Sequence, residues 1–191
     1  MRTAIRALIL LLIALWLGAV LYFPVVAGTA FTVLTDTHTA GTIVGQCLRF
    51  LHYEGLICGA LIVLLLLVAQ WVKAVPRSVI APVAVTLVML ALTAFSQFSI
   101  IPRMENYRIA AGGAIDAVPP DNPNRIAFNK LHNQSETVEE GVMLAGLVLI
   151  VLVAANFPGT VDQIFPNARI TSPQPETRTE ATRTNDTRVP D

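Results

Sequence analysis

The chain has 191 residues, of which 54% are hydrophobic and only 14% are charged, and its formal net charge is zero. Soluble domains usually carry about 25% charged residues, so this composition excludes an ordinary water-soluble globular protein. The balanced charge gives no bulk electrostatic attraction to nucleic acid, which we do not expect as a partner. The composition instead predicts a protein whose main partner is the lipid bilayer.

The first apolar run, residues 7–27, contains no charged residue and follows two arginines. It is long enough for a hydrocarbon core of ~30 Å, which needs about 20 helical residues. A signal peptide has the same order of charge and apolar residues, but this run is long for one and contains Trp16 and Pro24. We therefore predict a retained membrane helix at residues 5–34.

The second apolar run has its core from Gly55 to Val72, and helix-compatible sequence begins near Ala40. Two GxxxG patterns, which begin at Gly41 and Gly55, each place two small residues on one face of this helix. Small residues allow a neighbouring helix to approach closely, so we interpret both patterns as packing within a bundle. The predicted helix covers residues 40–73.

Two further apolar runs complete the predicted membrane region. The third predicts a helix at residues 78–102, which ends at Pro102 because proline disfavours the helical conformation of the residue before it. A polar segment rich in turn residues follows. Helical periodicity returns at Asn124 and leads into the fourth run, so we predict a helix at residues 124–157 that begins outside the membrane.

The predicted fold is an all-α membrane protein, a four-helix up-and-down transmembrane bundle formed by residues 1–157. Residues 158–191 are rich in threonine, proline and charged side chains and contain too few apolar groups to offset the entropy cost of ordering. They predict a disordered tail. Lysine and arginine residues gather near the end of the bundle that holds both termini, which predicts that both termini are cytoplasmic.

This topology brings polar residues of the second and fourth helices to the opposite end of the bundle. Arg49 and His52 share one face of the second helix. We expect Arg49 to form an ion pair with Glu139 or Glu136 of the fourth helix, with His132 in the same cluster. The residues proposed to bind a ligand or handle protons are Arg49, His52, His132, Ser135, Glu136 and Glu139.

Three interpretations of this cluster remain open. Its side chains pair with one another or with lipid headgroups, or they form a small-ligand or proton-handling pocket, or they hold a metal ion. The candidate metal ligands are His52, His132, Glu136 and Glu139. The HExxH, P-loop, GxSxG and CxxC motifs are absent from the sequence, so we do not expect an enzyme.

Several short motifs, in their order and spacing, resemble the transmembrane-protein-205-like family of small four-helix membrane proteins. The motifs are Trp16-Leu17-Gly18, Phe31-Thr32-Val33-Leu34, Leu48-Arg49-Phe50, Ile101-Pro102-Arg103, and Phe128 with Leu131, His132 and Ser135. The resemblance covers roughly residues 10–155. It implies four membrane helices and, for a bacterial member, a domain of unknown function located in the inner membrane.

The leading functional expectation is a non-enzymatic membrane protein that binds or passes a small ligand or metal through the polar site, without a resident cofactor. A second hypothesis is a haem-binding membrane oxidoreductase in which His52 and His132 are the two axial ligands. A third is an accessory subunit of a membrane complex, and a homo-oligomer is a further possible assembly.

Overall fold

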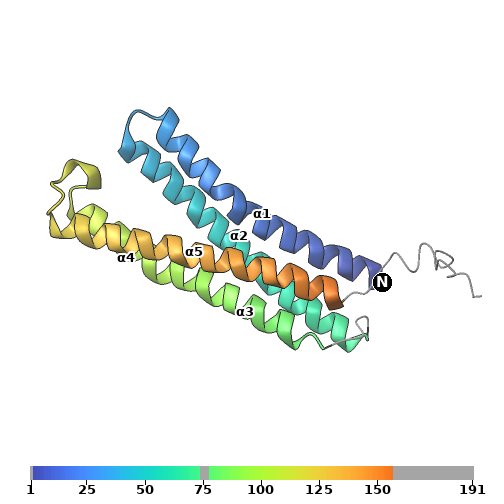
Figure 1. The fold of residues 1–191 in the computed structure, drawn as a ribbon. Coiled ribbons are helices and arrows are strands. Elements are labelled where there is room, and N and C mark those ends of the chain that lie inside the picture. The colour runs from blue at the N-terminus through green and yellow to red at the C-terminus, as the bar shows by residue number, and fades with distance from the viewer. Residues whose placement is uncertain (1, 74–77, 157–191) are drawn as a thin grey trace, which may run out of the picture. The chain divides into compact units, whose positions relative to one another are not determined.

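The computed structural model describes residues 2–73 and 78–156, which belong to one compact unit. The predicted tail at 158–191 lies outside these residues. The described chain is built from helices and contains no β-strand (Figure 1). The elements are α1 (Arg2–Val33), α2 (Thr37–Trp71), α3 (Ile80–Phe95), η1 (Ser96–Ile100), α4 (Ile101–Ala110), η2 (Ile115–Ala117) and α5 (Pro123–Asn156).

Four of the described helical segments are long and apolar enough to cross a membrane. They are Thr3–Val33, Thr37–Trp71, Ile80–Ala110 and Pro123–Ala155, with α3, η1 and α4 forming the third. The chain is therefore a multi-pass membrane protein, and the predicted all-α fold with four transmembrane helices is confirmed. At ~1.5 Å per residue each segment exceeds the ~30 Å hydrocarbon core, so its polar end extends beyond the apolar layer.

The prediction that the third helix ends at Pro102 is wrong, because the helix continues to Ala110. Residues 96–100 form a π-helical turn, in which the Ile101 N–H donates to the Ser96 carbonyl five residues back. A π-helical turn replaces i→i−4 backbone hydrogen bonds with i→i−5 bonds. The regular α-helical hydrogen-bond pattern is therefore already interrupted next to Pro102, which has no N–H group to donate. Pro102 then occupies the first turn of α4, where proline is tolerated.

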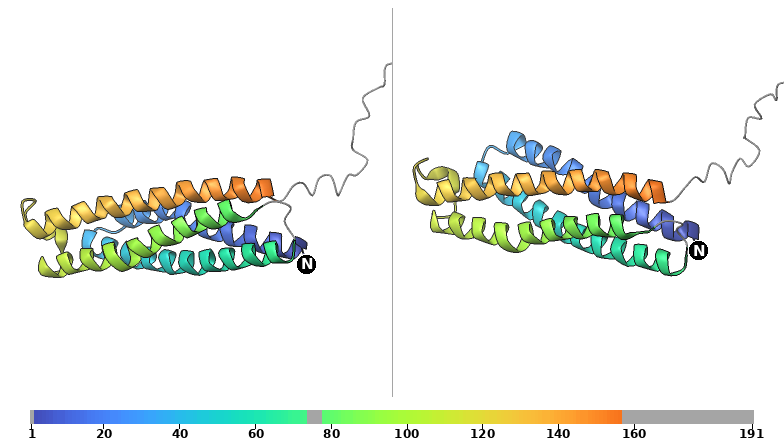
Figure 2. Two further views of the ribbon diagram at one scale, coloured as in Figure 1. Left: turned by 90° about the horizontal axis from the view of Figure 1, so that it is seen from below. Right: turned by 60° about the horizontal axis from the view of Figure 1, so that its bottom comes forward.

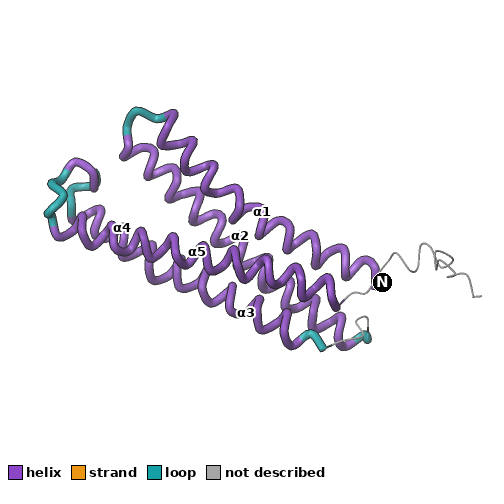
Figure 3. The backbone as a smooth tube through the Cα atoms, in the orientation of Figure 1, coloured by secondary structure: helices purple, strands orange, loops and turns teal. Residues whose placement is uncertain are grey.

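The long helices pack in alternating directions (Figure 2). Contacts join α1 to α2 and α2 to α3, and both α3 and α4 pack on α5, which also contacts α1. Figure 3 shows the loops at 34–36 and 111–122 at the end of the bundle remote from the N-terminus. We call this the distal end.

The second GxxxG pattern accommodates an indole ring of α1. Trp16 is 1% exposed, and its ring lies so close to α2 that a Cβ atom at Gly55 would be 2.3 Å from the indole Nε1. A Cβ at Gly59 would be 2.8 Å from Cζ3 of the same ring. These glycines therefore pack within the bundle as predicted, but against a side chain of α1.

Asp36 caps the first turn of α2. Its carboxylate accepts hydrogen bonds from the backbone N–H groups of His38 and Thr39 and from the Thr39 hydroxyl. These bonds, chiefly that from the Thr39 hydroxyl, lower the pKa of Asp36. Because the pKa of Asp36 is lower in the folded protein than in the unfolded chain, the cap stabilises the fold at pH values above the unfolded-state pKa. This stabilisation is lost as the pH falls through the folded-state pKa.

We expect Asp36→Ala to lower the melting temperature slightly at pH 7, whereas Asp36→Asn keeps most of the cap because asparagine also caps helices well. The difference between the parent and Asp36→Ala should shrink as the pH falls below about 4. Thermal unfolding of the detergent-purified proteins at both pH values measures this. Identical melting temperatures for the parent and Asp36→Ala at pH 7 would contradict the capping role.

Candidate functional site

A cavity of about 960 Å³ lies between α1, α2, α4 and α5 toward the distal end. Its volume is at the upper end of the range for small-molecule sites, roughly 300–1,000 Å³. The apolar part of its wall includes Val20, Phe23, Phe31, Leu51, Ile101, Phe128 and Met143. The ionisable lining residues are His38, Arg49, Glu105, Asp116, His132, Glu136, Glu139 and Glu140.

Glycine residues help to create this space. Gly28 of α1 and Gly45 of α2 both line the cavity, and a Cβ atom built on either one would meet no atom within 4 Å. The nearest atom to a Cβ at Gly41 would be in the Phe31 ring, at 3.9 Å. Unlike the second GxxxG pattern, the first one therefore leaves room beside the helix.

A hydrogen-bonded triad joins three helices behind the cavity wall. His52 of α2 is fully buried, and its Nδ1 lies 3.0 Å from Oε1 of Gln97 in the π turn. Its Nε2 lies 2.6 Å from Oε1 of Glu139 in α5. Gln97 is 6% exposed and the Glu139 side chain 17%, so both contacts of the imidazole are shielded from solvent.

The hydrogen-bonding capacities of the three side chains constrain the protons of the triad. The Gln97 oxygen can only accept, so His52 Nδ1–H donates to it. The 2.6 Å contact between Nε2 and the Glu139 carboxyl then requires one proton between the two atoms. Whether that proton belongs to the imidazole or to the carboxyl, the pair has no net charge, which reduces the cost of burying it.

Gln97 is the functional residue that the sequence-based cluster missed. It occupies the π turn, and such turns are frequent at functional sites because they redirect side chains. Its sequence signal is an amide-bearing residue within the apolar run 79–101, since polar groups at membrane depth are costly and need a partner.

Glu139 connects the triad to the cavity. Its side chain lines the cavity, whereas His52 does not. One carboxylate oxygen contacts His52, and the other makes no hydrogen bond within the described part of the chain. Glu139 therefore presents an oxygen to the cavity while His52 and Gln97 hold the carboxyl group in place.

Arg49 lines the same cavity but forms no hydrogen bond or ion pair with any described residue, so the predicted pairing with Glu139 or Glu136 is not found. His52, which lies one turn further along α2, takes Glu139 instead.

His132 and Glu136 form a separate local pair at 3.3 Å on α5, with side chains 54% and 62% exposed. The His132 ring also stacks on Phe128, with ring centroids 6.3 Å apart. Ser135 lines the cavity and is 4% exposed, and its hydroxyl has no hydrogen-bond partner among residues 2–73 and 78–156. The structure thus separates His132 from the His52–Glu139 pair.

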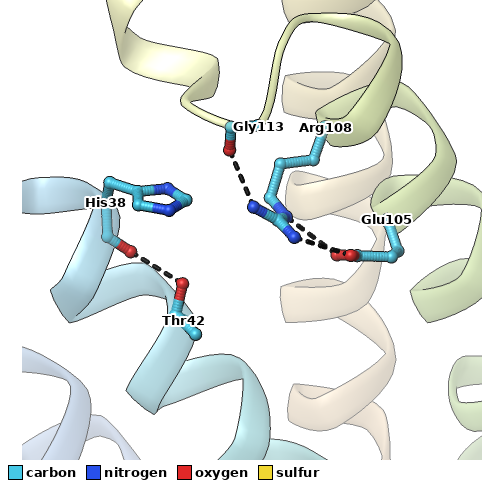
Figure 4. A network of polar contacts seen from close by, with 5 residues as sticks. All are labelled: His38, Thr42, Glu105, Arg108 and Gly113. Atoms are coloured by element: carbon cyan, nitrogen blue, oxygen red, sulfur yellow. Dashed lines mark hydrogen bonds and ion pairs between the residues drawn. The ribbon is translucent and has the colours of Figure 1, made fainter.

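An arginine network joins α4 to the following loop, next to the cavity-lining residue Glu105 (Figure 4). The Arg108 guanidinium donates to both carboxylate oxygens of Glu105, at 2.7 and 2.8 Å, and to the Gly113 carbonyl, at 2.7 Å. Gly113 has φ +94°, a conformation that glycine adopts without strain. Figure 4 shows the His38 ring of α2 directed toward this network.

Two of the sequence-based hypotheses gain no geometric support. Within the described residues, no group of three or more histidine, cysteine, aspartate or glutamate side chains is arranged to hold a metal ion. Axial haem ligation by His52 needs a free ring nitrogen, and both of its nitrogens are hydrogen-bonded inside the bundle.

Residues 11–111 match the family described as Domain of unknown function (DUF4149). The chain belongs to this family. No curated protein and no solved structure matches the sequence. The family match spans α1 to α4 and includes Arg49, His52 and Gln97, whereas Glu139 lies beyond it. The family description assigns no activity, so the function has to be argued from the cavity and the triad.

Proposed function

We propose that this protein binds a small amphipathic molecule in the distal cavity. The observation that supports this function is a cavity of about 960 Å³ with apolar walls, into which a few polar groups converge. Binding sites for small molecules typically combine these two features, since the apolar wall supplies affinity and the polar groups fix orientation. Among the polar lining groups, we assign this orienting role to the Glu139 carboxyl group and the Ser135 hydroxyl.

We further propose that the protein acts by binding and not by catalysis. His52 and Glu139 are a potential acid–base pair, but the imidazole is fully buried and does not line the cavity, so it cannot reach a bound substrate. We also propose that the protein is a member of the transmembrane-protein-205-like family. We propose that it lies in a bacterial inner membrane with both termini in the cytoplasm. This orientation places the cavity toward the opposite face of the membrane.

Filling the cavity should abolish binding without disturbing the fold. We expect Gly45→Leu to weaken binding of the neutral fluorescent probe Nile red about tenfold or more, the loss that corresponds to ~1.4 kcal/mol. Gly45 lines the cavity, and its new side chain meets no atom within 4 Å at Cβ, so it extends into the empty space. Fluorescence titration of the protein in nanodiscs measures this, with empty nanodiscs as the background.

Gly18→Leu is the matched control. Gly18 is also a helical glycine with open space around it, but it does not line the cavity, so probe binding should equal that of the parent. Equal Nile red signals from the parent, Gly45→Leu and empty nanodiscs would overturn the proposed function.

A further inference from the structure

We propose that the natural occupant of the cavity is an organic cation with an apolar body, bound by carboxylates of α5 and by aromatic rings. This inference rests on the proposed function and specifies the chemical class of the ligand. It follows from the charges that remain around the cavity after internal pairing, from the rings in its wall and from one hydroxyl group that has no partner among the described residues.

The charge balance of the wall is negative on the α5 side. Five lining residues carry carboxyl groups, and two of these have arginine partners: Glu105 is paired with Arg108, and Asp116 lies 3.9 Å from Arg125. The other three lie on α5 and are Glu136, Glu139 and Glu140. Glu136 lies three and four residues before Glu139 and Glu140, which are adjacent to each other. Their negative charges therefore repel one another.

These three carboxyl groups are only partly neutralised. Glu139 shares one proton with His52, and Glu136 contacts the exposed His132 ring. Glu140 has no hydrogen bond or ion pair with any described residue. Because Glu140 has no basic partner among the described residues, the α5 wall presents a net negative charge to the cavity.

Aromatic rings provide a second feature that favours a cation. Phe23 and Phe31 of α1 and Phe128 of α5 all line the cavity. The face of a phenylalanine ring is electron-rich and attracts a cation that has lost part of its water shell. The same rings can also pack against the apolar part of an amphipathic molecule. They therefore favour both the charged group and the apolar body of such a ligand.

Ser135 provides an observation that does not depend on the acidic residues. Its side chain is 4% exposed, lines the cavity and has no hydrogen-bond partner within the described residues. A hydroxyl group that lines a cavity and has no partner in the protein is free to form a hydrogen bond with a polar group of a ligand. The hydroxyl oxygen can accept a hydrogen bond from an ammonium group held at Glu139.

An anionic ligand fits less well. Among the described residues, Arg49 is the single arginine or lysine that lines the cavity. An anion bound there would face the three glutamates of α5, whose like charge disfavours it.

Two ions of closely similar size and shape but opposite charge test this inference. In nanodiscs of zwitterionic lipid, we expect saturable binding of tetraphenylphosphonium that is about tenfold or more tighter than that of tetraphenylborate, each corrected for empty nanodiscs. Glu140→Gln should weaken phosphonium binding several-fold while Nile red binding is retained, and Glu139→Gln should also weaken phosphonium binding several-fold. Glu140→Gln leaves the triad intact, so its result does not depend on the stability of Glu139→Gln.

Glu54→Gln is the matched control, because Glu54 lies on α2 outside the cavity wall and should leave phosphonium binding unchanged. Equal or tighter binding of tetraphenylborate by the parent would overturn the cationic class while leaving cavity binding intact. Phosphonium binding that is unchanged in both glutamate variants would do the same. Absence of saturable binding of both ions and of Nile red would instead overturn the proposed function itself.

Discussion

His52→Ala is expected to lower the free energy of unfolding by about 3 kcal/mol, the size of effect seen when one partner of a buried charge pair is removed. The substitution deletes a fully buried imidazole that bonds both Gln97 and Glu139. It leaves a carboxyl group and an amide oxygen without their partner inside the bundle. Thermal or denaturant unfolding in detergent measures the loss.

A double-mutant cycle separates this pairing from simple loss of packing. Glu139→Gln in the His52→Ala background removes the stranded carboxylate, so the double variant should be more stable than the sum of the single losses predicts, by about 0.5–3 kcal/mol. Arg49 makes no ion pair with a described residue, so Arg49→Ala and Glu139→Gln should be close to additive.

His132→Ala is the control for His52→Ala. His132 is 54% exposed and pairs with a glutamate on its own helix, so its removal should cost less than about 0.5 kcal/mol. Equal losses for the two histidines, or strict additivity of His52→Ala and Glu139→Gln, would show that the triad does not hold the bundle together.

Gly55→Ala is expected to destabilise the protein by about 1–3 kcal/mol, the usual cost of overpacking a core. The added Cβ would lie 2.3 Å from Nε1 and 2.8 Å from Cε2 of Trp16, well inside van der Waals contact. Trp16 is 1% exposed and surrounded by the core, so the indole cannot move aside freely. The measurement is the shift in thermal unfolding of the purified variant.

Gly45→Ala carries the same chemical change at an open position of the same helix. It should be neutral or stabilising, by up to about 1 kcal/mol, because alanine favours the helix more than glycine does. The opposite signs at the two positions are the test. A stabilising Gly55→Ala would mean that the indole does not pack against α2 as closely as the structure shows.

The four membrane helices could be predicted because each needs only a long apolar run, which is a local property of the sequence. The grouping of Arg49, His52, Glu136 and Glu139 toward one end also followed from topology, since alternating helix directions bring those segments together. The length of an apolar run and the direction of a helix do not depend on particular side-chain contacts. They therefore indicate which segments approach one another, but not which residues pair.

Which side chains pair across two helices depends on how deeply each one is buried and on which partners compete for it. The spacing of residues along the sequence does not contain this information. Arg49 and His52 lie on one face of α2, yet the shorter and deeper histidine takes Glu139. Gln97 reaches His52 from a π turn, whose presence no hydrophobic pattern indicated. The same turn carries the helix through Pro102, so one backbone irregularity accounts for both the missed residue and the misplaced helix end.

The π turn also divides the third membrane helix into two parts that differ in angular phase. Before it, the buried residues Thr86, Met89 and Thr93 follow the usual helical spacing. A π-helical turn contains about one extra residue, so the faces of the helix before and after it differ by ~100°. After the turn, Ile101, Met104 and Glu105 line the cavity. One continuous helix therefore contributes to both the tightly packed core and the polar cavity.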